Sequence, residues 1–256
     1  MSSGAYAIAA GGGAVIGLLL AVFGGGGSVL ATPLLMFGVG VRDAHVAIGT
    51  AAAAVSLNAL VALGGQARAG HVKWPCALVF GGVGLVGTLI GADLAKHVNG
   101  HRLLLWFAAI MALIGASMLL PRKAEGDPAV RLNPTLAGRL APLGLVTGLA
   151  AGFFGIGGGF LILPGLMAAT GMTLKHAAAA SLVSVVLFGA ATSASYAASG
   201  LVDWPLFAAL VVGGAIGAMA GLPVVKALAG NARAARQVFA VAVVAVAGYV
   251  AWRALS

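Results

Sequence analysis

The sequence predicts an all-α membrane protein, a polytopic helix bundle made of two related halves. Hydrophobic residues make up 61% of the 256-residue chain and charged residues only 7%, whereas a soluble domain carries about 25% charged residues. Several apolar stretches approach the ~20 residues with which a helix crosses a bilayer. One glycine-rich pattern also occurs twice, so we expect an integral membrane protein that arose by internal duplication.

The glycine-rich pattern keeps its order and spacing in both halves. The matched landmarks, each pair 131 residues apart, are Phe23 and Phe154, Pro33 and Pro164, Gly40 and Gly171, and His45 and His176. Glycine is less favourable than alanine inside a helix by about 1 kcal/mol. The glycine runs at 24–27 and 155–159 therefore predict a break inside an apolar segment of each half. Duplicated halves with broken helices are typical of secondary transporters.

The apolar segments follow the same order on both sides of a polar stretch. In the first half they cover residues 5–23, 29–38, 45–63, 74–94 and 103–120. In the second half they cover residues 140–154, 160–170, 176–198, 204–225 and 235–254. The sequence therefore predicts a first membrane repeat at 1–120, a polar linker loop at 121–139 and a second membrane repeat at 140–256.

Two further patterns justify the fourth segment of each half. The dipeptides at 74–75 and 204–205 are both Trp-Pro, which suits a helix start because proline fits the first turn and tryptophan favours the membrane interface. Small residues then recur on about one helix face: Gly84, Gly87 and Gly91 in the first half, and Gly214, Gly217 and Gly221 in the second. Close helix packing through these glycines is expected.

The distribution of lysine and arginine favours a hairpin at each glycine run. If each glycine-interrupted segment crossed the membrane, the cations would divide seven against seven. If each one folds back as a re-entrant hairpin, one side holds only four: Arg42, Lys96, Arg102 and Arg253. The other side then holds ten: Arg68, Lys73, Arg122, Lys123, Arg131, Arg139, Lys175, Lys226, Arg233 and Arg236. Positive charge collects in cytoplasmic loops, so we expect three spanning helices per half, inverted repeats and both termini outside.

Composition excludes several classes of function. The net charge of +9 is confined to the gaps between apolar segments, which indicates cytoplasmic membrane loops rather than nucleic-acid binding. Every carboxylate lies near a segment end or in the linker: Asp43, Asp93, Glu125, Asp127 and Asp203. A cation exporter is disfavoured, because cation sites usually need a carboxylate inside the membrane. No metal-ligand cluster or catalytic set is visible, so we expect no enzyme activity, metal or cofactor.

The two glycine loops are the first candidate site. A broken helix exposes backbone N–H groups at the start of the next helix, and those groups with the local dipole can bind an anion without arginine. The residues assigned to this role are Gly25, Gly26, Gly27 and Ser28 in the first loop and Gly157, Gly158 and Gly159 in the second. The alternative is that the glycines serve close helix packing. A nucleotide-binding loop is rejected because no Lys-Ser/Thr follows the glycines.

Polar residues on the long helix after each loop are the second candidate. Thr50 and Asn58 lie in the first half, and Ser181 and Thr192 in the second, with Ser181 equivalent to Thr50. Polar side chains in a membrane turn inward and hydrogen-bond across helices. Structural bonding and lining of a substrate pathway both remain open for these residues.

His45 and His176, equivalent in the two repeats, are the third candidate. Histidine titrates near physiological pH, so these residues could couple transport to protons. Their charged neighbours Arg42, Asp43 and Lys175 favour the simpler interpretation that each lies at a helix start near the interface.

The duplicated pattern Gly-x-Gly-Gly-(Gly/Ser)-x-(Leu/Ile)-x-x-Pro, with a Trp-Pro downstream, resembles the TauE/SafE family of sulfite exporters or anion permeases. The matches run from Gly24 to Pro33 and from Gly155 to Pro164, and the resemblance covers roughly residues 11–252. It implies a bacterial inner-membrane transporter with about seven or eight helices. It also implies movement of sulfite, organosulfonates or related sulfur oxyanions, often as export. Ser28 departs from the pattern of the second loop, where Gly159 stands.

The sequence hypothesis is therefore a secondary transporter that exports a small sulfur-containing anion across the cytoplasmic membrane by alternating access. Its expected partners are the anion, membrane lipid and a coupling proton or ion, with oligomerisation left open and no nucleic acid. The alternatives are a transporter of another small anion, such as a carboxylate, and a membrane assembly partner that transports nothing.

Overall fold

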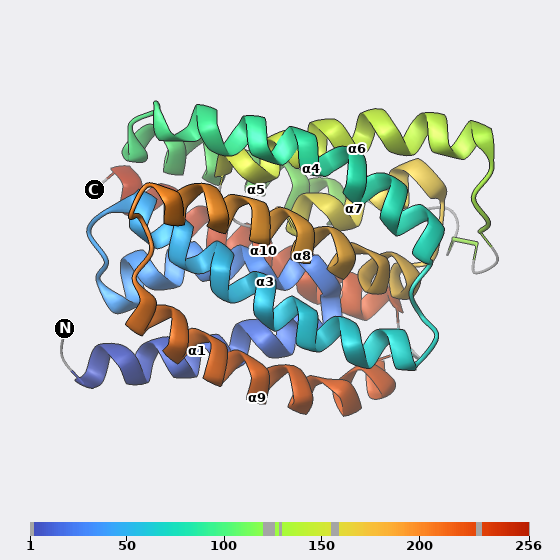
Figure 1. Cartoon of the computed structure of the whole chain (residues 1–256). Coiled ribbons are helices and arrows are strands. Elements are labelled where there is room, and N and C mark those ends of the chain that lie inside the picture. Colours follow the sequence, from blue (N-terminus) through green and yellow to red (C-terminus); the bar gives the residue numbers. More distant parts are fainter. Residues whose placement is uncertain (1–2, 120–125, 128–129, 155–158, 229–231, 256) are drawn as a thin grey trace.

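In the computed structural model the chain forms a bundle of helices (Figure 1). The structure describes residues 3–119, 126–127, 130–154, 159–228 and 232–255. Within these ranges the single β pairing is an isolated bridge between Asp127 and Met172. Six helical stretches of the described chain are long and apolar enough to cross a membrane: Gly4–Val39, Ala44–Arg68, Trp74–Lys96, Pro134–Phe154, Leu174–Ala198 and Trp204–Gly221. The all-helical membrane fold expected from the sequence is thus confirmed.

The first half contains one irregular helical segment between regular helices. Its elements are α1 (Ser3–Phe23), η1 (Gly24–Leu30), α2 (Ala31–Pro33), η2 (Leu34–Val39), α3 (Ala44–Arg68), α4 (Trp74–Lys96) and α5 (Gly100–Leu119). The glycine run forms a 3₁₀ helix and residues 34–39 a π helix, so the expected break in α1 is confirmed as a change of helix type. Gly40 ends this segment with a φ of 87°, and the Asp43 carboxylate caps α3 by accepting from the His45 N–H at 2.8 Å.

The second half repeats the regular helices. Its elements are α6 (Pro134–Phe154), α7 (Gly159–Thr170), α8 (Leu174–Ala198), α9 (Trp204–Leu228) and α10 (Ala232–Leu255). Helix α6 begins inside the stretch 121–139 that the sequence assigned to a linker loop. The Asn133 side chain accepts from the Leu136 N–H at 2.7 Å, and Pro134 fits the first turn, so a capped helix start lies within that polar stretch.

Figure 1 shows the two chain termini at one end of the bundle and the connection between the halves at the other. Helix α1 leads away from the end with the termini, and residues 24–39 lead back, because α3 begins at that same end. The loops at 69–73 and 171–173 lie at the end with the connection. We call these the terminal end and the linker end.

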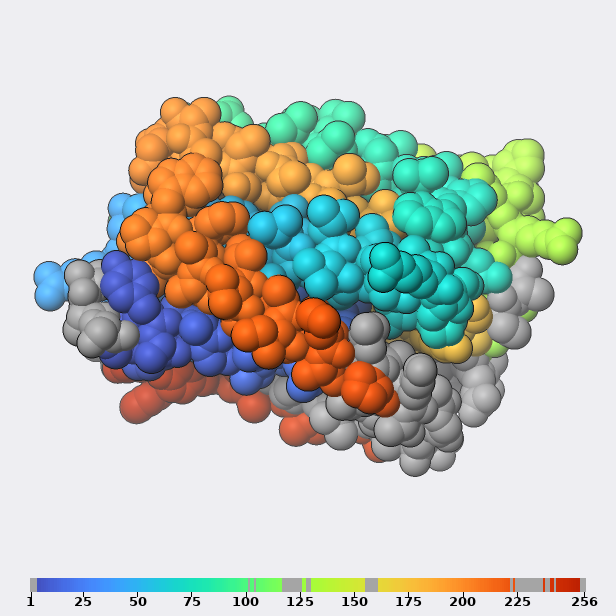
Figure 2. Space-filling view, turned by 60° about the horizontal axis from the view of Figure 1, so that its bottom comes forward, coloured from blue at the N-terminus to red at the C-terminus, as the bar shows by residue number. Residues whose placement is uncertain are grey.

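Helices from different halves pack most closely. Helix α1 lies along α9, and α4 lies along α6; Figure 2 shows α9 crossing α1 on one face. A Cβ at Gly17 would overlap the Gly214 carbonyl oxygen, and a Cβ at the equivalent Gly148 would overlap that of Gly84. The glycines expected to allow close packing do so, and the two interfaces correspond residue by residue.

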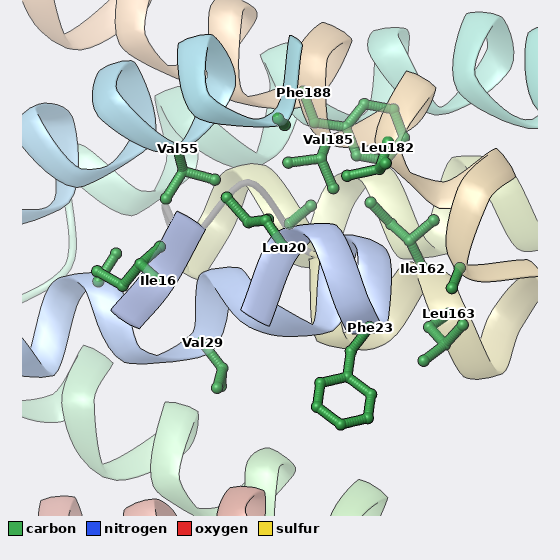
Figure 3. Packing of buried hydrophobic residues seen from close by; sticks show 14 of the residues in the cluster. Ile16, Leu20, Phe23, Val29, Val55, Ile162, Leu163, Leu182, Val185 and Phe188 are labelled. Atoms are coloured by element: carbon green, nitrogen blue, oxygen red, sulfur yellow. The ribbon is translucent and has the colours of Figure 1, made fainter. Parts of the chain in front are cut away.

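Helices α3 and α8 form the centre, because a larger share of their residues is buried than in the other candidate spans. Their crossing includes a hydrogen bond from Ser56 Oγ to the Val186 carbonyl oxygen at 2.9 Å. Apolar side chains surround the irregular segment: Figure 3 shows Ile16, Leu20, Val55, Ile162 and Val185 gathered about it from α1, α3, α7 and α8. The glycine loop is therefore embedded in the core.

Candidate functional site

The described glycine loop is held in a conformation that requires glycine at its first position. Gly24 has a φ of 59°, which side-chain-bearing residues rarely adopt. A Cβ there would also overlap the Ala178 carbonyl oxygen of α8. Residues 24–29 are buried, so this loop is enclosed by protein and packed directly against α8.

Side chains from two other helices hydrogen-bond to the backbone groups that lose their helical partners at the break. In a continuous helix the Gly25 N–H would donate to the Ala21 carbonyl oxygen. Here the Gly25 N–H donates to Ser181 Oγ of α8 at 2.9 Å, and the Ala21 carbonyl oxygen accepts from Gln66 Nε2 of α3 at 3.0 Å. Ser181 and Gln66 are both buried. The break is therefore stabilised by one hydroxyl and one amide in place of a helical hydrogen bond.

The hydroxyls at the break form a short chain of hydrogen bonds. Ser181 Oγ donates to the Ala178 carbonyl oxygen at 2.8 Å, and Ser28 Oγ donates to the Gly25 carbonyl oxygen at 2.8 Å. The structure thus brings together Gly25, Ser28 and Ser181, with Gly26 and Gly27 between the first two. Each hydroxyl is engaged with protein, so an added ligand would have to exchange hydrogen bonds with these groups.

Several buried polar atoms of α2, α3 and α8 have no partner within the described chain. They are Thr32 Oγ1, Asn58 Oδ1, Ser184 Oγ and Thr192 Oγ1. All four residues are at most 1% exposed. Buried polar groups are nearly always hydrogen-bonded, so each of these atoms has unused bonding capacity. Ser184 and Thr192 lie on the face of α8 that carries Ser181.

The structure places Thr50 beside the start of α9 and Asn58 against α9. Thr50 Oγ1 accepts from the Asp203 N–H at 2.8 Å, beside the start of α9. Asn58 Nδ2 donates to the Leu210 carbonyl oxygen at 3.2 Å, and its side chain occupies the space beside Gly214. Both residues therefore join helices in this conformation. Asn58 Oδ1 has no partner within the described chain.

The two equivalent histidines lie at opposite ends of the α3–α8 pair. His45 at the start of α3 faces Tyr196 near the end of α8, with ring centroids 6.2 Å apart. His176 at the start of α8 has its Nδ1 2.8 Å from Thr173 Oγ1. They do not meet, so any role in proton coupling would belong to each end separately.

Of the second glycine loop, Gly157 and Gly158 lie outside the described residues, and Gly159 is the first residue of α7.

Sequence reasoning missed two residues at the break. Gln66 is absent from the predicted site, yet it reaches both α1 and His71, whose Nδ1 lies 2.7 Å from Gln66 Oε1. Thr32 follows Ser28 by four residues, which places both on one helical face. That spacing was the available signal for Thr32. Nothing in the sequence showed that Gln66 near the end of α3 approaches the end of α1.

An apolar groove lies between α1, the irregular segment and α10. Its volume is about 300 Å³, and Ile16, Pro33, Leu34, Phe37 and Tyr249 are among its lining residues. The lining offers an anion almost no hydrogen-bond donor, so the polar groups between the break and α8 are the better candidate site for a charged substrate.

Comparisons with known proteins find relatives among membrane transporters. The family model described as Sulfite exporter TauE/SafE matches residues 9–250. A "Probable membrane transporter protein" of Xylella fastidiosa (strain Temecula1 / ATCC 700964) is 40% identical over 248 residues, which cover 95% of this chain and 94% of that protein. The "Probable membrane transporter protein YdhB" of Bacillus subtilis (strain 168) is 27% identical over 69% of this chain and 73% of its own. No solved structure gives a significant match.

Proposed function

This chain belongs to the Sulfite exporter TauE/SafE family of membrane transporters, and on that premise we propose that it exports a small sulfur-containing anion, sulfite or a sulfonate, across the bacterial inner membrane. The observation that carries the proposal is the pair formed by the Gly25 N–H and Ser181 Oγ at the helix break. Both groups are hydrogen-bond donors inside the membrane-spanning core, and an oxyanion needs such donors.

Binding by neutral groups suits a substrate that must also leave. Among the described residues the buried polar side chains are hydroxyls and amides, without any lysine or arginine. In the proposed site an oxyanion inserts between Gly25 and Ser181 and accepts from both, while Ser184 and Thr192 supply hydroxyls further along α8. Hydrogen bonds to a charged acceptor are each worth about 1.5–3 kcal/mol, so a few of them hold an anion without trapping it.

The second loop would form the matching half of the site. By the repeat, Thr50 takes the place of Ser181, and Gly157, Gly158 and Gly159 take the place of the first glycine run. Asn58, with one unpartnered oxygen, lies on the same helix as Thr50. His45 and His176 remain proposed sites of proton coupling, one at each end.

We further propose that the two halves are inverted repeats with re-entrant hairpins. Helix α7 has 12 residues, about 18 Å of helix at 1.5 Å per residue, too short to cross a hydrocarbon core of about 30 Å. The matched α1–α9 and α6–α4 interfaces support a two-fold relation between the halves. Transport would then proceed by movement of one half against the other, exposing the enclosed break to each side in turn.

Transport by purified protein in liposomes tests the function. Vesicles loaded with radiolabelled sulfite should lose label faster than protein-free vesicles, and external sulfonates should compete more strongly than carboxylates of similar size. Ser184→Ala should slow efflux while leaving the protein folded, because its hydroxyl is unpartnered. If no sulfur oxyanion crosses under any ion gradient, or carboxylates compete better, the proposed substrate class is wrong.

A further inference from the structure

Four basic side chains gather at the linker end of the molecule, away from the glycine break. His71 and Lys73 belong to the loop between α3 and α4, and Lys175 and His176 begin α8. His176 lies within electrostatic range of the other three. These loops come from different halves of the chain, and both lie at the linker end of the bundle in Figure 1.

The two imidazole rings are held in place by protein hydrogen bonds. His71 Nδ1 lies 2.7 Å from Gln66 Oε1. Since that oxygen only accepts, His71 Nδ1 carries the proton. His176 Nδ1 lies 2.8 Å from Thr173 Oγ1. Within the described part of the chain, no hydrogen bond involves either Nε2 and no ion pair involves Lys73 or Lys175.

The cluster carries excess positive charge that an anion would compensate. Burial and the charge of Lys175 lower the pKa of His71 from its usual 6.5. Asp127 pairs with Met172 just before α8, where its N–H donates to the Gly171 carbonyl oxygen at 2.8 Å, and it has further contacts of its own. Grouped like charges repel unless a counter-ion binds.

We propose that His71, Lys73, Lys175 and His176 form a capture site for a small divalent or monovalent oxyanion at the linker end, connected to the glycine break through Gln66. Gln66 contacts His71 with its oxygen and the last turn of α1 with its nitrogen, so one side chain spans the two sites. That the captured anion is also the transported one rests on the proposed function. The linker end holds the larger share of lysine and arginine, which is typical of the cytoplasmic side from which an exporter loads.

Anion binding to the purified protein tests the capture site. Thermal unfolding is followed by intrinsic tryptophan fluorescence while sulfite or sulfate replaces chloride at constant ionic strength. The double variant Lys73→Gln/Lys175→Gln removes two charges from the cluster. The matched control, Arg42→Gln/Arg102→Gln, removes two exposed charges from the terminal end.

Wild type should be stabilised by the anions, the cluster variant should need about tenfold more anion, and the control should stay within about twofold of wild type. Equal behaviour of the two double variants, or no stabilisation of wild type, would overturn the capture site. Efflux separates the two proposals. If binding depends on the cluster but wild type moves no anion, the capture site stands and the transport function fails. If wild type transports the anion and the cluster variant transports it with the same KM, the transport function stands and the capture site fails.

Discussion

Replacing Ser181 with alanine should destabilise the protein, whereas the same replacement at Ser184 should not. Both serines lie on α8 and both are fully buried. Ser181 Oγ accepts from the Gly25 N–H at 2.9 Å, while Ser184 Oγ has no partner in the described chain. The two variants remove the same atom from equally buried positions and differ in whether a backbone group loses its partner.

The magnitude follows from the hydrogen bond that is lost. Ser181→Ala leaves a buried N–H unsatisfied, which costs about 1–3 kcal/mol. For a chain of this size each kcal/mol lowers the melting temperature by roughly 2–4 °C, so a fall of about 2–12 °C is expected for Ser181→Ala. Ser184→Ala removes a hydroxyl that was itself unsatisfied, and its melting temperature should stay within about 2 °C of wild type or rise.

The protein contains its own probe for this measurement. Cys76 is the one cysteine in the chain and is buried in α4, so a thiol-reactive fluorescent dye reports unfolding as the side chain becomes accessible. The comparison is made in detergent without sulfite, since sulfite would react with the dye. Equal melting temperatures for the two variants, or a larger fall for Ser184→Ala, would refute the account of the helix break.

Three further predictions concern packing, the break and pH. Gly17→Val should abolish folding or lower the melting temperature steeply because its side chain would enter the α9 backbone, whereas Gly11→Val, with open space around it, should melt near wild type. Gln66→Leu should lower the melting temperature by an amount similar to Ser181→Ala and reduce efflux, and a fully active, equally stable variant would contradict its role at the break. Burial and the charge of Lys175 lower the pKa of His71 from its usual 6.5. The stabilising contribution of neutral His71 is therefore present above that pH and is lost as pH falls through the folded-state pKa. Between about pH 7.5 and pH 5 the melting temperature of anion-free wild type should fall more than that of His71→Gln.

The helical class and the position of the break could be predicted from the sequence because both depend on local chemistry. Apolar composition fixes membrane insertion, and four consecutive glycines cannot continue an α-helix favourably. The glycines at 84, 87 and 91 indicated a packing face in the same way. The sequence predicts this helix from residue 140, whereas α6 begins at Pro134. Charged residues and prolines in the polar stretch obscured the capping signal at Asn133.

The partners of the break could not be predicted, because they come from distant parts of the chain. Gly25 and Ser181 are separated by 156 residues, and Ala21 and Gln66 by 45. A helical pattern shows that Ser181 faces inward, but the group that it meets depends on how α8 packs against the first half. Thr50 and Asn58 are candidates from the sequence because they are polar residues inside a predicted span, and that property left helix bonding and pathway lining equally open; in this conformation they bond to the start of α9 and to α9.

The central claim is that the helix break binds the anion with Gly25 and Ser181. A density map of the protein in a lipid nanodisc, collected with saturating sulfite, tests it most directly. We expect an anion that accepts from the Gly25 N–H, with the present 2.9 Å bond to Ser181 Oγ opened. An intact Gly25–Ser181 hydrogen bond, with the anion bound elsewhere in the membrane-spanning core, would contradict it.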